Sequence, residues 1–98
     1  MGVTAIADLA VRPKNVDELI SVFQELLPVT RKYEGCLGIE LHRNQDDSNN
    51  LILIQEWRTR EHHEKYIAWR TETGVMDQVG AYLIRPPGFR YFDHIETM

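Results

Sequence analysis

The chain has 98 residues, 43% of them hydrophobic and 27% charged, which is the composition of an ordinary globular domain. Its formal net charge of −4 argues against nucleic acid as a partner, because phosphate binding needs a basic surface. The single cysteine, Cys36, excludes an internal disulfide and offers no cysteine pair to a metal. We expect one cytoplasmic domain over residues 1–98, with no signal peptide and no membrane-spanning segment.

The first predicted element is a strand over Val3–Val11. Both alternating sets of its side chains are largely apolar, a pattern typical of a strand that is covered on both faces. In so short a chain, we expect a partner subunit to provide the second cover. A turn over Arg12–Lys14 follows, and Asn15, with Glu18 three positions later, is a good cap for the next helix.

The next predicted element is an amphipathic helix that runs to about Tyr33 and is terminated by Gly35. Pro28 lies inside it and has no N–H to bond to Gln24, so we expect a kink in the preceding turn. The apolar stripe consists of Val16, Leu19, Ile20, Phe23, Leu26 and Leu27.

Two strands joined as a hairpin through the polar loop Asn44–Asn50 are predicted next. Cys36–Arg43 alternates cleanly between apolar and polar residues, which indicates one buried face, whereas Leu51–Arg58 is apolar on both faces. The sets expected to face inward are Leu37, Ile39 and Leu41 on the first strand and Leu51, Leu53, Gln55 and Trp57 on the second.

The last third of the chain predicts two helices and a strand. Thr59 caps a helix that runs to about Thr73 and ends at Gly74. A shorter helix over Val75–Ile84 and a final strand over Phe89–Ile95 follow. The order β-α-β-β-α-(α)-β predicts an α+β fold, the ferredoxin-like split βαβ arrangement with a four-stranded antiparallel sheet.

In this arrangement one face of the sheet carries the helices, and the other face is bare in a monomer. An exposed apolar patch of this kind usually marks an interface, and a two-fold homodimer is the commonest way to cover it. We therefore expect the protein to bind a second copy of itself. The side chains expected on the bare face are Ile6, Ile52, Ile54 and Phe92.

Several segments carry a resemblance to a known family. The run TRKYEGCLGIELH, Thr30–His42, resembles the helix-to-strand junction of antibiotic biosynthesis monooxygenase (ABM) domains. The run IQEWRTRE, Ile54–Glu61, resembles the exit of that family's third strand into its second helix, and Ala5–Asp8 and the Arg12–Pro13 turn also fit. The resemblance implies a dimeric α+β barrel. It also implies a cofactor-independent monooxygenase that oxidises a quinol or polycyclic phenol with dioxygen, with neither metal nor flavin.

The resemblance also points to particular residues, with departures. Trp57 is similar to the tryptophan that lines the pocket of polyketide-oxidising members. Those members carry an asparagine where Leu53 stands and a tyrosine where His63 stands. Many quinol-oxidising relatives carry a histidine where Tyr66 stands. The mechanism of these relatives therefore cannot be transferred unchanged.

Our candidate catalytic residues are His63, Tyr66 and Trp57. Neutral His63 could accept a proton near pH 7, Tyr66 could hydrogen-bond a developing phenolate, and the spacing of His63, Tyr66 and Arg70 places them near one helical face. Each residue also has a purely structural interpretation. This is core packing for Tyr66 and Trp69, a solvated or hydrogen-bonded helix histidine for His63, and a surface charge for Arg70. The candidate substrate-binding residues, for an apolar aromatic small molecule, are Leu41, Leu53, Trp69 and Arg70.

The sequence also bears on metal binding, on haem degradation and on two further functions. Adjacent helix residues such as His62 and His63 point about 100° apart and cannot easily grip one ion, so we expect no metal and no cofactor. Haem-degrading relatives use a first-strand asparagine, where this chain offers Ala7 beside Asp8, and haem degradation ranks lower for that reason. An isomerase-type enzyme and a non-catalytic small-molecule-binding dimer on the same fold remain open alternatives.

Overall fold

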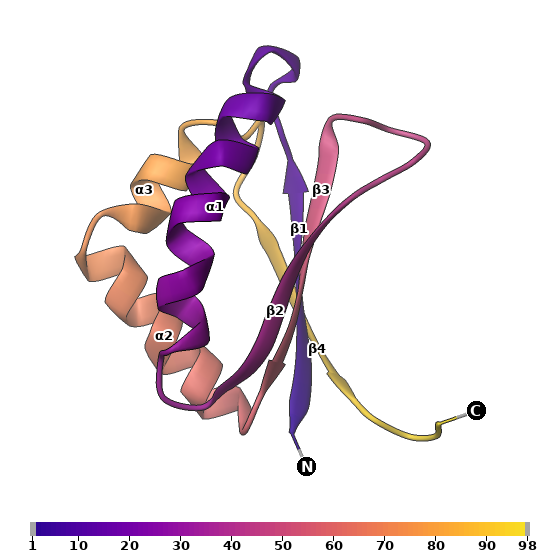
Figure 1. Cartoon of the computed structure of the whole chain (residues 1–98), viewed down its shortest axis with the longest axis vertical. Helices are drawn as coiled ribbons and strands as arrows, with labels where there is room; N and C mark the ends of the chain where they lie inside the picture. The colour runs from indigo at the N-terminus through magenta and orange to yellow at the C-terminus, as the bar shows by residue number, and fades with distance from the viewer. Residues whose placement is uncertain (1, 98) are drawn as a thin grey trace.

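A four-stranded antiparallel sheet with helices packed on one of its faces makes up the protein (Figure 1). The structure is a computed structural model and describes residues 2–97. The sheet order β2-β3-β1-β4 confirms the predicted α+β ferredoxin-like fold. The elements are β1 (Val3–Ala10), the 3-10 turn η1 (Pro13–Asn15), α1 (Val16–Arg31), β2 (Cys36–Arg43), β3 (Asn50–Trp57), α2 (Arg60–Glu72), α3 (Val75–Gly80) and β4 (Gly88–Asp93).

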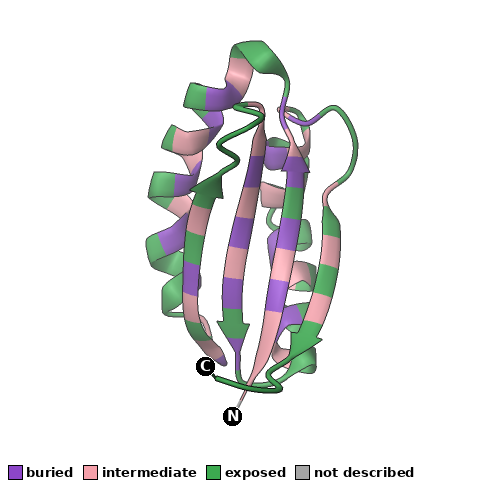
Figure 2. Cartoon of the chain, turned by 90° about the vertical axis from the view of Figure 1, so that its right-hand side faces the viewer, coloured by how far each residue is buried: buried purple, intermediate pink, exposed green. Residues whose placement is uncertain are grey.

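β1 lies at the centre of the sheet and pairs with β3 on one side and β4 on the other. Ala7 of β1 is opposite both Leu53 and Phe89. The two-residue period of the strand directs Ala5, Ala7 and Leu9 toward the helices, where they are at most 2% exposed. The alternate residues face the other side of the sheet, which carries no helix in Figure 2. On β1 and β3 these residues are partly buried, apart from the exposed Asp8 and Glu56.

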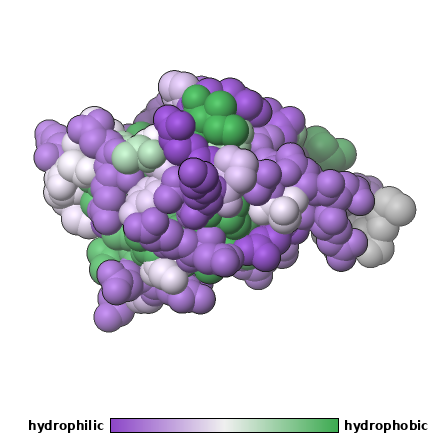
Figure 3. Space-filling model, turned by 90° about the horizontal axis from the view of Figure 1, so that it is seen from above, coloured by the Kyte–Doolittle hydropathy of each residue, from purple (hydrophilic) through white to green (hydrophobic). Residues whose placement is uncertain are grey.

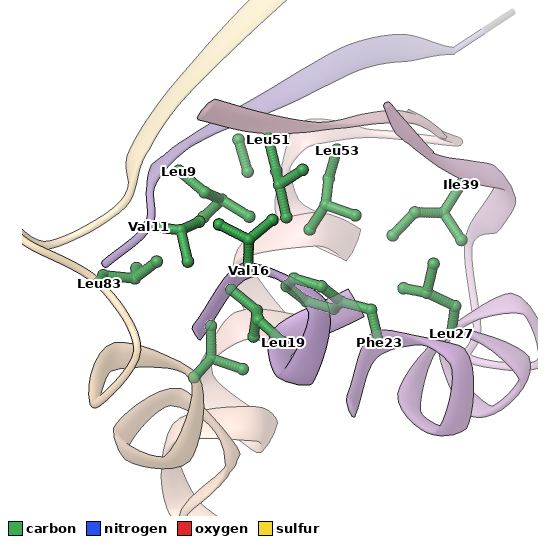
Figure 4. Close-up of a cluster of buried hydrophobic side chains, with 12 residues drawn as sticks. Leu9, Val11, Val16, Leu19, Phe23, Leu27, Ile39, Leu51, Leu53 and Leu83 are labelled. Carbon is green, nitrogen blue, oxygen red and sulfur yellow. The ribbon is translucent and has the colours of Figure 1, made fainter. Parts of the chain in front are cut away.

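The main hydrophobic core lies between the sheet and α1. Figure 4 shows side chains of the sheet and of α1 pointing toward one another across this layer. The apolar stripe predicted for the first helix is the face that α1 buries, because residues three and four apart share one side of a helix. The core comprises Ala7, Leu9, Val11, Val16, Leu19, Phe23, Leu27, Ile39, Leu51, Leu53, Val79 and Leu83.

The N-cap of α1 differs from the predicted one, and the helix continues past its internal proline. Asn15 is the N-cap position but makes no side-chain cap hydrogen bond, because it ends η1 with φ −116° and ψ 6° rather than in an extended conformation. Its side-chain amide instead donates to the Glu18 carboxylate at 3.2 Å. Pro28 lies inside a helix that continues to Arg31, three residues beyond it.

Three further expectations are corrected. Leu37 is 56% exposed rather than inward-facing, because a register shift between Cys36 and Gly38 removes it from the alternation of β2. α3 ends at Gly80 rather than Ile84, because Leu83 leaves the helix to form a bridge with Val11. The final strand spans Gly88–Asp93 rather than Phe89–Ile95, ending where its pairing with β1 ends.

The molecular surface is largely polar at the end that carries the N-terminus of α1 and the β2–β3 loop. Viewed from this end, hydrophobic side chains form separate patches among hydrophilic ones (Figure 3). None of the helices within residues 2–97 is long and apolar enough to cross a bilayer.

Two glycines with positive φ provide a matched test of the α1–β2 junction. Gly35 (φ +88°) and Gly74 (φ +84°) both adopt the left-handed conformation that side chains disfavour. A Cβ at Gly35 would also lie 2.6 Å from His62 Cβ, whereas a Cβ at Gly74 would meet open space. Gly35 therefore fixes a close approach between the junction and the start of α2.

We predict that Gly35→Ala is more destabilising than Gly74→Ala. Gly74→Ala should cost about 1–2 kcal/mol from the left-handed backbone alone. Gly35→Ala should cost a further ~1–3 kcal/mol, because the helix start must move to relieve the overlap. Urea denaturation of both variants measures the difference. Equal losses of unfolding free energy would contradict the packing seen at Gly35.

Candidate active site

The inward face of α2 is polar. Thr59 caps the helix by accepting a hydrogen bond from the backbone N–H of His62 at 3.1 Å, as predicted from the sequence. The buried residues of α2 are His63, Tyr66 and Arg70, so the predicted shared face is confirmed. Arg70 is only 5% exposed, and the alternative of a surface charge is therefore wrong.

Trp57, His63 and Tyr66 form an aromatic cluster where β3 leads into α2. Trp57 is fully buried, and its ring centroid lies 5.5 Å from that of His63 and 5.1 Å from that of Tyr66. Trp69 is partly buried beside this cluster and stacks on Tyr33 with a centroid separation of 5.2 Å. The structure thus brings the three candidate catalytic side chains together.

Gln55 is a buried polar residue of the site that sequence reasoning did not select. The indole Nε1 of Trp57 donates to Gln55 Oε1 at 3.0 Å. Because an indole N–H can only donate, this contact fixes the orientation of the carboxamide and leaves the Gln55 amino group for another partner. The signal was present in the sequence as one polar residue in the inward-facing set Leu51, Leu53, Gln55 and Trp57.

Arg70 joins α2 to the last turns of α1. Its Nε donates to Tyr66 Oη at 2.9 Å, and its Nη2 donates to the Leu26 carbonyl at 2.9 Å and to Thr30 Oγ1 at 3.1 Å. Thr30 Oγ1 and Tyr66 Oη lie 2.6 Å apart, and Thr30 Oγ1 donates to the Leu26 carbonyl at 3.3 Å. We call these four residues the arginine network.

The two hydroxyls of the arginine network share one short hydrogen bond, in which either Thr30 or Tyr66 can be the donor. When Tyr66 donates, the Thr30 proton is directed to the Leu26 carbonyl. The guanidinium cannot accept, and every one of its contacts in the network is a donation. In the arrangement where Tyr66 donates to Thr30, Tyr66 has no proton left to offer a ligand.

His63 is buried beside the cluster. Its Nδ1 shares a hydrogen bond with Tyr91 Oη at 2.7 Å, and its Nε2 is the one side-chain polar atom within residues 2–97 that is buried without a partner. Burial lowers the pKa of His63 to about 4, and the smaller effect of Glu64 acts in the opposite direction. The imidazole is therefore neutral at pH 7.

An apolar cavity of about 50 Å³ lies between the helices and the sheet. Of the predicted site residues, Leu53, Tyr66 and Arg70 line it, whereas Trp57 and His63 are not among its lining residues. Leu41 packs at the edge of the core, and Trp69 is likewise outside the lining. The residues lining the cavity are Ala7, Leu9, Phe23, Leu26, Leu27, Thr30, Ile39, Leu53, Gln55, Tyr66, Ile67, Arg70, Val75, Met76, Val79, Pro87 and Phe89.

The titratable residues do not form a metal centre in the part of the chain that the structure describes. No three histidine, cysteine, aspartate or glutamate side chains gather there closely enough to hold an ion. The polar groups of the cavity are hydroxyls, a carboxamide and a guanidinium, supplied by Thr30, Tyr66, Gln55 and Arg70. These groups can hydrogen-bond a ligand but none is a base at neutral pH.

We predict that His63 makes the folded protein less stable in mild acid. Between its unfolded value of about 6.5 and its folded value of about 4, the unfolded chain binds a proton that the folded chain does not. The free energy of unfolding should therefore fall by roughly 2–3 kcal/mol as the pH drops through this window. Urea denaturation over this pH range measures the slope.

Two variants identify the source of that slope. His63→Phe removes the titrating group and should flatten this contribution to the pH dependence. Tyr91→Phe removes the hydrogen bond but keeps the buried imidazole, so the slope should persist, since burial is the main cause of the shift. The assignment fails if His63→Phe and the unmodified protein lose stability in parallel.

Comparison with solved structures shows how widely this fold is shared. An antibiotic biosynthesis monooxygenase is 22% identical, with a TM-score of 0.84 and coverage of 96% of this chain and 99% of that chain. Rv0793 from Mycobacterium tuberculosis is 23% identical, with a TM-score of 0.83 and coverage of 99% of this chain and 98% of that chain. A mutant of SnoaB, a cofactor-independent oxygenase from Streptomyces nogalater, is 18% identical, with a TM-score of 0.83 and coverage of 99% of this chain and 96% of that chain. At such identities the likeness establishes the fold alone.

The sequence comparison identifies the family. None of the curated proteins matches the chain significantly. The family model described as antibiotic biosynthesis monooxygenase matches residues 2–71, from the start of β1 to near the end of α2. Gln55, Trp57 and Arg70 all lie within that segment. Because the match covers well over half of the 98 residues, this chain belongs to the antibiotic biosynthesis monooxygenase family.

Proposed function

We propose that the protein is a cofactor-independent monooxygenase that oxidises a small quinol or related phenol with dioxygen. Family membership supports an oxygenation, and SnoaB, which shares the fold, is named a cofactor-independent oxygenase. The observation that carries the proposal is a buried cation, Arg70, in the wall of an otherwise mainly apolar cavity. Such a site suits an aromatic ring that carries a negative charge in the reactive state.

The proposed reaction needs no redox group on the protein. A quinol loses a proton, and its anion passes one electron to dioxygen, giving a semiquinone radical and superoxide. The two radicals combine in a carbon–oxygen bond, and the protonated peroxide then loses water to leave a hydroxyquinone. One oxygen atom of dioxygen enters the product and the other leaves as water, so atoms and electrons balance.

The protein's contribution would be to favour the anion and to exclude water. Apolar side chains from both the sheet and the helices line the cavity, and this lowers the local dielectric constant and strengthens electrostatic interactions inside it. A cation in such surroundings stabilises a developing oxyanion more than the neutral quinol. The proton can leave to solvent before the ring is enclosed.

The cavity volume favours a single ring over a polycyclic substrate. About 50 Å³ is smaller than the cavity of roughly 150 Å³ that holds benzene in an engineered protein core. Even one ring therefore requires side chains of the wall to move. Met76 is a partly buried member of that wall, and methionine adapts easily because its unbranched chain has three rotatable bonds.

A non-catalytic small-molecule-binding protein is the second candidate. The observation that favours it is the set of polar groups in the cavity wall, Thr30, Gln55, Tyr66 and Arg70, which includes no proton acceptor of the usual kind. The same wall would hold an aromatic anion without turning it over. Oxygen consumption separates the two candidates.

We also propose that two copies associate through the bare face of the sheet. This face carries partly buried Ile6, Ile52 and Ile54 and the 43% exposed Phe92, with Glu56 among the exposed positions. Covering such a face with an identical one removes apolar surface from water on both copies. The helices on the opposite face leave the cavity outside this interface.

We predict that the metal-free protein consumes dioxygen when supplied with monocyclic hydroquinones. Ala7 lies in the cavity wall and is 1% exposed, so Ala7→Val should fill the cavity and lower kcat/KM at least tenfold, about 1.4 kcal/mol. Ala68→Val makes the same change at an exposed position of α2 and should retain activity. An oxygen electrode and product spectra measure both, with thermal melting to confirm folding.

The outcome of that assay decides between the two candidates. Uptake no greater than that of heat-denatured protein would refute the monooxygenase. Saturable binding of the hydroquinone without uptake would then support the binding protein.

We predict a dimer at micromolar concentration by sedimentation velocity. Ile54→Lys places a charge in the middle of the bare face and should shift the protein to a monomer. Val29→Lys changes a 47% exposed residue of α1, on the helical side, and should leave the dimer intact. A monomeric unmodified protein would contradict this interface.

A further inference from the structure

The charge of Arg70 has no counter-charge among residues 2–97. The ion pairs between Gly2 and Thr97 are all on the surface and all lie elsewhere, at His42–Glu40, Arg43–Asp17 and Arg60–Glu64. Arg70 is 5% exposed, its hydrogen bonds go only to neutral acceptors, and its guanidinium carbon lies 4.8 Å from the centre of the Trp69 ring. A buried charge without an opposite charge is unfavourable, so an anion that enters this site has a ready partner.

Two of the five guanidinium N–H groups remain free within the described residues. Nε–H and the two Nη2–H groups serve Tyr66, Thr30 and the Leu26 carbonyl, whereas no described residue accepts from Nη1. The carbonyl end of α1 is the negative end of its dipole and accounts for the side of Arg70 that faces this helix. The helix dipole does not explain the state of Nη1. This group has no acceptor among residues 2–97, yet it is not among the fully buried polar atoms, so it stays accessible.

Gln55 provides a second free donor in the same cavity wall. Trp57 occupies its carbonyl oxygen, and no residue within the described part of the chain accepts from its amino group. The hydroxyls of Thr30 and Tyr66 share a hydrogen bond with each other, which occupies one of their two protons. The polar wall of the cavity therefore offers hydrogen-bond donors, one of them charged, and no carboxylate.

We propose that the Nη1 group of Arg70 and the amino group of Gln55 form an oxyanion subsite that binds a small phenol in its ionised form. This inference rests on the proposed function for the class of ligand and deepens it by naming the groups that hold the reactive oxygen. The subsite takes the place of a general base. By binding the anion more tightly than the neutral phenol, it lowers the pKa of the bound hydroxyl, and water takes the proton.

4-Nitrophenol tests the subsite without any turnover, because its phenolate is yellow and its neutral form is not. Quenching of Trp57 and Trp69, the two tryptophans of the chain, reports binding. Absorbance titration with the protein in excess gives the pKa of the bound probe. We expect it to lie at least one unit below the value in buffer, which corresponds to an anion bound at least tenfold more tightly than the neutral phenol.

Matched variants assign the effect to the two residues. Arg70→Met keeps an unbranched apolar stem and should abolish the shift, whereas Arg85→Met removes an exposed arginine and should leave it unchanged. Gln55→Met should reduce the anion preference at least threefold, and it keeps the test decisive if Arg70→Met does not fold. Thermal melting identifies the folded variants.

Each remaining outcome supports or overturns the subsite. A shift that persists in folded Arg70→Met, a bound pKa equal to that in buffer, or no saturable binding overturns it. A shift in the unmodified protein without oxygen uptake from hydroquinones leaves the subsite standing and removes the monooxygenase. Oxygen uptake without a shift in the pKa of the bound probe supports the monooxygenase and overturns the subsite.

Discussion

The insertion of the Arg70 guanidinium between α2 and the last turns of α1 is the interaction on which the rest of the site depends. Its Nη2 links α2 to α1 by donating to the Leu26 carbonyl at 2.9 Å and to the Thr30 hydroxyl at 3.1 Å. It also commits the Tyr66 hydroxyl at 2.9 Å. Because the cation is buried, each of these contacts is made where water does not compete, and losing the arginine would leave several buried polar groups unpaired.

Strand pairing positions the opposite wall of the cavity. The register between β1 and β3 sets Gln55 opposite Ala5 and Leu53 opposite Ala7, so small side chains of the central strand lie beside the larger ones of β3. This leaves room above the sheet, and α1 and α2 close it. The two-residue period that points Gln55 and Leu53 inward also points Ile54 outward, so one strand serves both the proposed site and the proposed dimer face.

The chemistry of the site follows from which hydrogen-bonding groups the fold uses internally. His63 and Tyr66 are attractive candidates as residue types, yet His63 Nδ1 bonds to Tyr91 and the Tyr66 hydroxyl bonds to Thr30 and Arg70, while His63 Nε2 is buried without a partner in the described chain. The unused nitrogen donors of the cavity wall belong to Gln55 and Arg70. A site built from donors and a cation favours an anionic ligand over a neutral one, whichever of the two candidate functions the protein performs.

Local patterns determined the elements and the shared face of α2. The 3.6-residue stripe of α1, the alternation of β1 and β3, the Thr59 cap and the spacing of His63, Tyr66 and Arg70 each depend on neighbours in the chain. The bulge that exposes Leu37, the bridge that ends α3 and the burial of Arg70 were decided by tertiary structure. In the sequence, Arg70 looks like any charged residue on a helix. Its burial depends on acceptors from Leu26 and Thr30, about forty residues earlier in the chain. Such pairings between distant segments have no periodic signature in sequence, because they arise only when the helices pack.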